Sequence, residues 1–131
     1  MMREGEMLIR SFFATLSEGD LDRLGEFFDE RSTWTICARD IAGAGTHTGR
    51  NAIIEGFLRP VRGLFEPGQP TIDITRVIVD GRFVAVEAAG RGRLLNGNEY
   101  DNRYAYVIEL DGPVVRALSE YMDTHHAASV V

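Results

Sequence analysis

The chain has 131 residues, the length of a single domain that can build one core around a modest cavity. Its 20 acidic and 14 basic residues give a net charge of −6, which argues against a surface for nucleic acid. The lone Cys37 has no partner for an internal disulfide, the N-terminal residues lack the apolar core of a secretion signal, and no run reaches the roughly 18 apolar residues of a membrane span. We therefore expect one domain over residues 1–131, in the cytoplasm, with neither nucleic acid nor a membrane as its partner.

The first half of the sequence predicts three helices. Apolar residues fall at helical spacing over residues 6–16. Asp20 follows a break in this pattern and is a good N-cap for a short second helix that runs through Phe28. A third apolar stripe begins after Thr48, a residue type that can cap a helix, and we expect Pro60 to bend or end that helix.

Strand patterns precede the third helix and fill the rest of the chain. Residues 32–38 predict a strand with Trp34 and Ile36 on one face, and residues 41–47, which contain two glycines, predict a loop. Four further strands are expected over residues 72–79, 83–95, 98–110 and 114–123, with turns at Asp80-Gly81, Gly97-Asn98 and Asp111-Gly112. The sum is an α+β architecture in which the helices cover one face of a curved antiparallel sheet.

Polar side chains recur on one face of the last two strands. Strand side chains alternate with period two, so Asn102 and Tyr104 share a face in one strand, and Leu118, Glu120 and Met122 share a face in the next. If both faces look into the same interior, a carboxylate, an amide and a phenol lie in an apolar pocket. Such a pocket favours proton-transfer chemistry.

Four segments extend this pattern over nearly the whole chain. They are residues 13–22, the short strand with Trp34, residues 45–50 at the approach to a helix, and the ending that holds residues 102–104 and 120–123. Together they resemble the NTF2-like superfamily, specifically its SnoaL-like branch. The resemblance implies an NTF2-like cone, in which N-terminal helices pack on a strongly curved, mixed or antiparallel sheet that encloses a pocket. It also implies a homodimer formed through the outer sheet face.

The resemblance specifies the fold better than the activity, because this scaffold hosts cyclases, isomerases, epoxide hydrolases, dehydratases and binding proteins. Ketosteroid isomerases use a tyrosine and a carboxylate base, and the positions in this chain that resemble those of the tyrosine and the base hold Phe12 and Ile36. Neither side chain can play that part, which argues against that chemistry. Ala88 and Gly90 stand where limonene epoxide hydrolases have an arginine and an aspartate. Glu120 falls close to the acid/base carboxylate of SnoaL-type cyclases, and it is the one role that the resemblance supports.

We therefore expect Glu120 to act as a general acid/base, because its apolar neighbours should raise its pKa. Asn102 and Tyr104 would hold a substrate oxygen, although pocket lining is the favoured role for both. The reaction would be a cofactor-free isomerisation, cyclisation or lyase-type step on a bulky apolar molecule, such as a polycyclic one, for which Ala88 and Gly90 leave room. The other expected lining residues are Trp34, Ile36, Phe57, Val61, Ile74, Leu118 and Met122, with His47 in a loop at the pocket mouth.

The alternative is a non-catalytic module that binds a small ligand or forms a dimer. Glu120 is the one titratable side chain among the confidently inward positions, and it could equally serve an ion pair. Trp34 could be core filler and His47 an exposed loop residue. No metal site is expected, because His125 and His126 are adjacent and would point to opposite faces of a strand.

Overall fold

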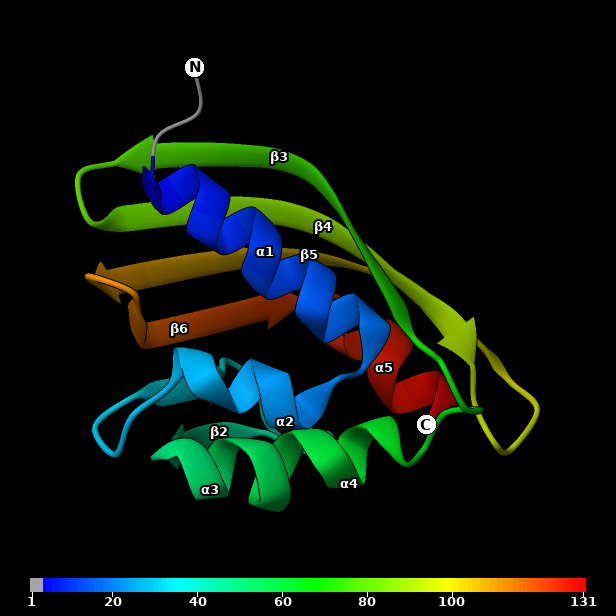
Figure 1. Ribbon diagram of the computed structural model, residues 1–131. Coiled ribbons are helices and arrows are strands. Elements are labelled where there is room, and N and C mark those ends of the chain that lie inside the picture. The colour runs from blue at the N-terminus through cyan, green and yellow to red at the C-terminus, as the bar shows by residue number, and fades with distance from the viewer. Residues whose placement is uncertain (1–3) are drawn as a thin grey trace.

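In the computed structural model, which describes residues 4–131, helices lie against the concave face of a curved, unclosed sheet (Figure 1). The six strands are β1 (Thr33–Ile36), β2 (Gly45–Thr48), β3 (Thr71–Asp80), β4 (Phe83–Arg93), β5 (Glu99–Asp111) and β6 (Val114–Met122). In the sheet they follow the order β2-β1-β6-β5-β4-β3. The β1 and β6 strands pair in parallel, and every other neighbouring pair is antiparallel. The predicted α+β class with a mixed, strongly curved sheet is confirmed.

The first helix supplies the main apolar layer over the sheet. The α1 helix (Glu4–Glu18) crosses strands β3 to β6 (Figure 1). It buries the Phe13 ring against Tyr106 and the Phe12 ring against Phe28 and Trp34. The α2 helix (Leu21–Leu24) follows, and a 3₁₀ turn over Gly25–Phe27 extends it. Asp20 caps α2 as predicted, since its side chain accepts a hydrogen bond from the Arg23 backbone N–H.

The third helical stretch differs from its prediction at its N-cap, and it continues past Pro60. It comprises α3 (Arg50–Ile53), a π-helical turn (Ile54–Leu58) and α4 (Arg59–Arg62). Its N-cap is Gly49, with a φ of 90° and no capping side chain, so the predicted cap at Thr48 is wrong. Pro60 does not end the stretch, which continues to Arg62; it directly follows the π-helical turn and lies in the first turn of α4, where its missing N–H is tolerated.

The strands agree with their predictions to within a few residues, with one exception. The β2 strand was predicted as part of a loop, yet it pairs with β1 from Thr33↔Thr48 to Ile36↔Gly45. It has no alternating apolar pattern, since its four residues are exposed or half-buried, so pairing with β1 alone defines it. Two hairpin turns fall one residue later than predicted, at residues 81–82 and 112–113.

The sequence analysis missed a helix at the C-terminal end. The α5 helix (Thr124–Val130) begins at Asp123, whose side chain accepts a hydrogen bond from the His126 backbone N–H. His125 and His126 therefore lie on a helix, and the strand assumed for them is wrong. Within residues 4–131, no helix has the length and apolar character needed to cross a membrane.

The buried side chains form two clusters. The larger one joins α1 to the inner sheet face and contains Trp34, Phe57 and Tyr106. The smaller one, formed by Phe65, Leu94, Tyr100 and Ala127, lies where α5 packs on β5. The space between these clusters is the position of the candidate site.

Candidate functional site

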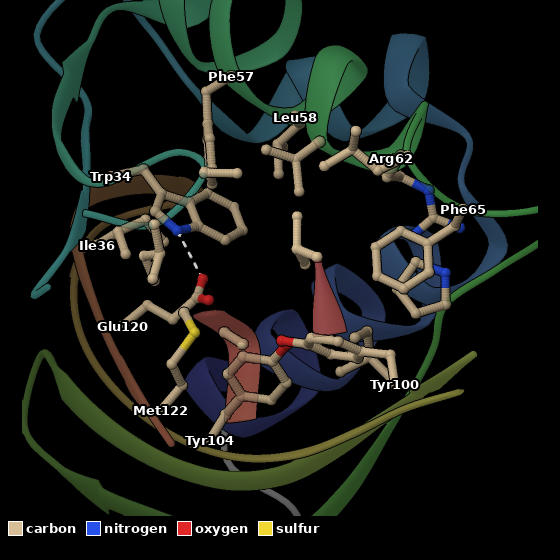
Figure 2. Close-up of a pocket in the computed structure, with 18 of the residues that line it drawn as sticks. Trp34, Ile36, Phe57, Leu58, Arg62, Phe65, Tyr100, Tyr104, Glu120 and Met122 are labelled. Carbon is tan, nitrogen blue, oxygen red and sulfur yellow. Dashed lines mark hydrogen bonds between the residues drawn. The ribbon is translucent and has the colours of Figure 1, made fainter. Parts of the chain in front are cut away.

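A cavity of about 320 Å³ separates the two clusters (Figure 2). Strands β1, β5 and β6 form one wall, and the π-helical turn with α4 forms the opposite wall. Residues 40–42 and the α5 helix contribute to its rim. This volume is at the small end of ordinary ligand pockets, which span roughly 300 to 1,000 Å³. It suits a ligand of a few fused rings.

Glu120 is the charged group on the inner face of β6. It is only 7% exposed, and the Trp34 Nε1–H donates a hydrogen bond of 2.9 Å to its Oε1 atom (Figure 2). The parallel pairing of β1 with β6 sets Ile36 beside Glu120 and so brings the indole within reach. Among the described residues, every side-chain oxygen or nitrogen atom that is itself sealed from solvent has a hydrogen-bond partner. The Glu120 Oε2 atom has none, so it is not sealed. We conclude that Oε2 opens to the cavity.

Burial raises the pKa of the Glu120 carboxyl from 4.5 to about 7. Loss of hydration is the larger effect, and the hydrogen bond from Trp34 opposes it by favouring the carboxylate. The ion pairs among residues 4–131 do not include Glu120, so no cation offsets the cost of burying its charge. Both protonation states are therefore accessible near neutral pH, as a group that gives and takes protons requires.

Tyr100 and Tyr104 place two phenols in the same cavity. Both rise from the inner face of β5, and their hydroxyl groups are hydrogen-bonded to each other (Figure 2). The Asn102 Nδ2–H donates to the Tyr100 oxygen at 3.1 Å, and either phenol can be the donor in the bond between the two tyrosines. When Tyr100 donates, the Tyr104 proton is free for a ligand. Burial raises the pKa of both phenols, so they stay protonated hydrogen-bond donors.

Asn102 does not face the cavity, contrary to the prediction that it holds a substrate oxygen. It is 1% exposed, and its amide is fully engaged within the protein. Besides Tyr100, its Nδ2–H donates to the Asp123 carbonyl at 3.1 Å, and its Oδ1 accepts from the backbone N–H groups of Asp123 and Arg103. Asn102 therefore positions Tyr100 and the start of α5.

The structure brings seven of the predicted site residues together around the cavity. They are Trp34, Ile36, Phe57, Val61, Tyr104, Glu120 and Met122.

Four other predicted lining residues lie in or beside the packed core instead. Gly90 leaves no room for a ligand, because a Cβ atom there would lie 2.6 Å from the Tyr104 ring. Ala88 stands opposite Tyr104 in the β4–β5 register, and Leu118 stands beside Trp34 in the β1–β6 register. Ile74 packs against the main core from the edge strand β3. These residues lie on the inner face of the sheet, as predicted, but aromatic rings occupy the space that was expected for a ligand.

His47 supports the cavity wall from behind. Its ring stacks on Phe57 with the centroids 4.4 Å apart and the planes 8° apart. Its Nε2 atom is hydrogen-bonded to the Gly43 carbonyl at 2.8 Å. The predicted place at the pocket mouth is therefore wrong, and its contacts fix the orientation of the Phe57 ring.

Several lining residues were not predicted. Tyr100 shares the parity of Tyr104 and could have been found by extending the same face of β5. Arg62 was hidden by the π-helical turn, which holds an extra residue and rotates the helix that follows it. Ala127 and Ala128 belong to α5, for which the sequence offered only the cap Asp123.

The arrangement is suited to proton transfer in an apolar enclosure. A carboxyl with a pKa of about 7 and phenol donors from the neighbouring strand line the same cavity. Within residues 4–131, no three His, Cys, Asp or Glu side chains are grouped to hold a metal ion.

Comparisons with known proteins agree with this architecture. A family model described as a SnoaL-like domain matches residues 9–117. An NTF2-like protein of unknown function from Burkholderia pseudomallei is 17% identical, with a TM-score of 0.88, over 99% of this chain and 98% of that one. A protein from Shewanella putrefaciens, proposed to be a SnoaL-like polyketide cyclase, is 15% identical, with a TM-score of 0.81, over 99% and 97% of the two chains.

A further solved structure carries the same fold with a bound small molecule. It is a protein with a ketosteroid isomerase-like fold from Catenulispora acidiphila, in complex with trimethylamine. It is 18% identical, with a TM-score of 0.80, over 94% of this chain and 90% of that one. No curated protein sequence matches the chain significantly. At these identities, the solved structures define the fold and leave the chemistry to the residues of the cavity.

Proposed function

Because the chain belongs to the family of SnoaL-like domains, we propose that its cavity is an active site in which Glu120 moves a proton on a small apolar molecule without a cofactor. One observation carries this proposal. Glu120 is buried, has one oxygen open to the cavity and has a pKa of about 7. The reaction class is an isomerisation, a cyclisation or a lyase-type elimination.

The chemistry follows from where the donors lie. The Glu120 carboxylate takes a proton from a carbon next to a carbonyl, and the electron pair of that C–H bond moves onto the carbonyl oxygen. The Tyr104 hydroxyl, held by Tyr100, donates a hydrogen bond to the oxygen as its charge develops. The Glu120 carboxyl then returns the proton to another carbon, or a leaving group departs with the electron pair.

The comparisons support this class of reaction by analogy alone. A related fold in Shewanella putrefaciens is proposed to be a polyketide cyclase, and another is described as ketosteroid isomerase-like. Phe12 and Ile36 of this chain stand at the positions that resemble those of the isomerase tyrosine and base. The acid/base group of this chain must therefore come from another strand. Glu120 on β6 meets that need.

Deuterium exchange into an enolisable ketone tests the proposal without knowledge of the natural substrate. We use 2-tetralone in D₂O at neutral pH and follow the loss of its α-proton signals by NMR. The wild-type protein should accelerate the exchange, and Glu120→Gln should slow the accelerated rate about 100-fold, the lower range for loss of a general base. Glu55→Gln is the control, because Glu55 pairs with Arg59 on the exposed side of the helix.

Two results would overturn the proposal. Exchange that is equal in wild type and Glu120→Gln would exclude Glu120 as the proton-transfer group. A Glu120 pKa close to about 4.3, measured by carbon-detected NMR with the glutamine variant as assignment control, would show an ordinary solvated carboxyl. Ligand binding without exchange would favour the alternative, a module that holds a small molecule unchanged.

We propose a second copy of the chain as the partner of the outer sheet face. Ile78, Ala85, Val107 and Ser119 form one row across four strands, and Ile78 and Val107 are exposed. The same face carries both charge signs, so two like faces need not repel each other. Val107→Glu should reduce the mass measured by sedimentation to that of a monomer, whereas Leu95→Glu, in an exposed turn, should not.

A further inference from the structure

Arg62 stands apart from the other arginines of the described chain. It is half-buried at the side of the cavity next to Phe65 (Figure 2), and the ion pairs of residues 4–131 do not include it. The neighbouring Arg59, three residues earlier, is bonded to Glu55 and Asp22 on the exposed surface. Arg62 therefore brings a positive charge to the side of the cavity with no carboxylate of the described residues within ion-pair distance.

The guanidinium group is held in place but is not saturated. Its Nη1–H donates a hydrogen bond of 3.0 Å to the Leu16 carbonyl at the C-terminal end of α1. That helix has no basic residue in its last turn, so Arg62 supplies the cation that the helix dipole favours there. A guanidinium has five N–H donors, and only the Nη1–H of Arg62 has an acceptor among the described residues.

Gly19 lets the group lie against the backbone. It has a φ of 79°, and a Cβ atom there would come within 2.9 Å of the Arg62 Nη2 atom. The hydrogen bond to Leu16 and the close approach to Gly19 hold one side of the guanidinium against the chain, which reduces the entropy lost when a ligand binds to it. Burial lowers the pKa of Arg62, which agrees with incomplete hydration of its charge.

We propose that Arg62 is the anchor for an anionic oxygen group on the ligand, so that the cavity selects an apolar ring compound bearing a carboxylate. This inference deepens the proposed function, since it names the substrate class for the same cavity. The fork of Arg62 suits the two oxygens of a carboxylate. The apolar walls formed by Leu16, Leu58 and Phe65 receive the ring system.

The other charges of the cavity orient such a ligand. Glu120 and the exposed Asp40 are the remaining charged lining residues, and both are acidic. A carboxylate beside Glu120 would be repelled once Glu120 ionises, whereas Arg62 on the helical wall attracts it. The acid group therefore binds at Arg62, and the ring carbons face Glu120 and Tyr104.

A matched pair of probes tests this assignment through binding alone. The probes are 2-naphthoate and its uncharged analogue 2-naphthamide, measured by isothermal titration calorimetry at about pH 6, where Glu120 is mostly protonated and the probe acid is ionised. Wild-type protein should bind the acid about tenfold more tightly than the amide. Arg62→Gln should remove this preference, and Arg62→Lys should retain part of it. Arg59→Gln should leave it unchanged.

The outcomes separate a ligand anchor from a helix cap. If Arg62 only caps α1, the Arg62→Gln variant melts at a lower temperature and binds both probes equally less well, with the acid preference unchanged. Equal affinity of the wild-type protein for both probes, or binding of neither, contradicts the inference. An acid preference without deuterium exchange would remove the proposed catalysis alone, and exchange without an acid preference would remove this inference alone.

Discussion

The two faces of the sheet treat charge in opposite ways. On the outer face, arginines and acidic residues pair across neighbouring strands, as in Arg91–Asp101 at 3.1 Å and Arg76–Glu87 at 3.3 Å. On the inner face, Glu120 has only the Trp34 N–H, and no cation pairs with it among the described residues. The same strands thus carry paired charges on one side and an unpaired, desolvated carboxyl on the other. A paired surface charge contributes little to stability, whereas a buried unpaired carboxyl lowers it at neutral pH and is typical of a functional site.

The pH dependence of stability gives the largest expected contrast between the faces. Because the pKa of Glu120 rises from 4.5 in the unfolded chain to about 7 in the folded protein, the folded state binds more protons between these values. The free energy of unfolding should fall by about 3 kcal/mol as the pH rises from about 4.5 to about 7. Urea unfolding at intervals across this range measures the decrease, which Glu120→Gln should abolish.

Asp29 is an internal control, because its pKa is shifted in the opposite direction from that of Glu120. The hydrogen bonds from Arg116 and from the Arg31 backbone hold the pKa of Asp29 well below its usual range. Its contribution is therefore complete above a pH of about 4 and is lost only in more acidic solution. A decrease between about pH 4.5 and 7 that persists in Glu120→Gln would assign the effect to another group and contradict the comparison.

Removal of Asn102 should have the next largest effect. Asn102→Ala leaves the Asp123 backbone N–H without its acceptor and removes one hydrogen bond from the Tyr100 hydroxyl and one from the Asp123 carbonyl, in a site that is almost fully buried. The free energy of unfolding should fall by about 2 kcal/mol or more. Asn96→Ala removes two exposed hydrogen bonds, one to the Val130 carbonyl and one from the Asn98 N–H, and should change the free energy of unfolding by less than about 0.5 kcal/mol. Equal effects of the two variants would contradict the role of Asn102 in positioning Tyr100 and α5.

The sequence predicted the inner face better than the cavity that it encloses. Period-two alternation placed Tyr104, Glu120 and Met122 on one face, because strand geometry makes parity a local property. The role of Asn102 depends on α5, a seven-residue helix whose sequence carries little beyond its cap. Whether an inward side chain reaches the cavity or packs against a neighbouring ring depends on tertiary packing, which a local sequence pattern does not show.

The helices show the same limit. Arg62 reaches the cavity through the rotation that the π-helical turn adds, and an ideal helical wheel does not contain that turn. The β2 strand likewise exists because β1 offers it an edge, since its own residues have no apolar face. Elements defined by their partners are the ones that the sequence did not reveal.

Trp34→Phe sharpens the comparison at a single hydrogen bond. The indole N–H stabilises the Glu120 carboxylate, so its loss should raise the pKa of Glu120 above about 7. The variant should then lose about 1.5 kcal/mol more stability above that pKa, where Glu120 is ionised, than below it. Carbon-detected NMR and urea unfolding measure the two effects. In a Glu120→Gln background the pH-dependent part should vanish, and its persistence would show that the indole acts through packing alone.

The outer face should give the smallest effect of all. Arg76 and Glu87 are 67% and 58% exposed, so water already screens their attraction. Arg76→Gln and Glu87→Gln should each change the free energy of unfolding by less than about 0.5 kcal/mol, and the double variant should show a coupling no larger than that. A coupling well above this value, which weakens at high salt, would make the outer charges a cooperative network. Charge pairing on that face would then be part of what stabilises the sheet, and the stability that the buried Glu120 loses on ionising would be offset there.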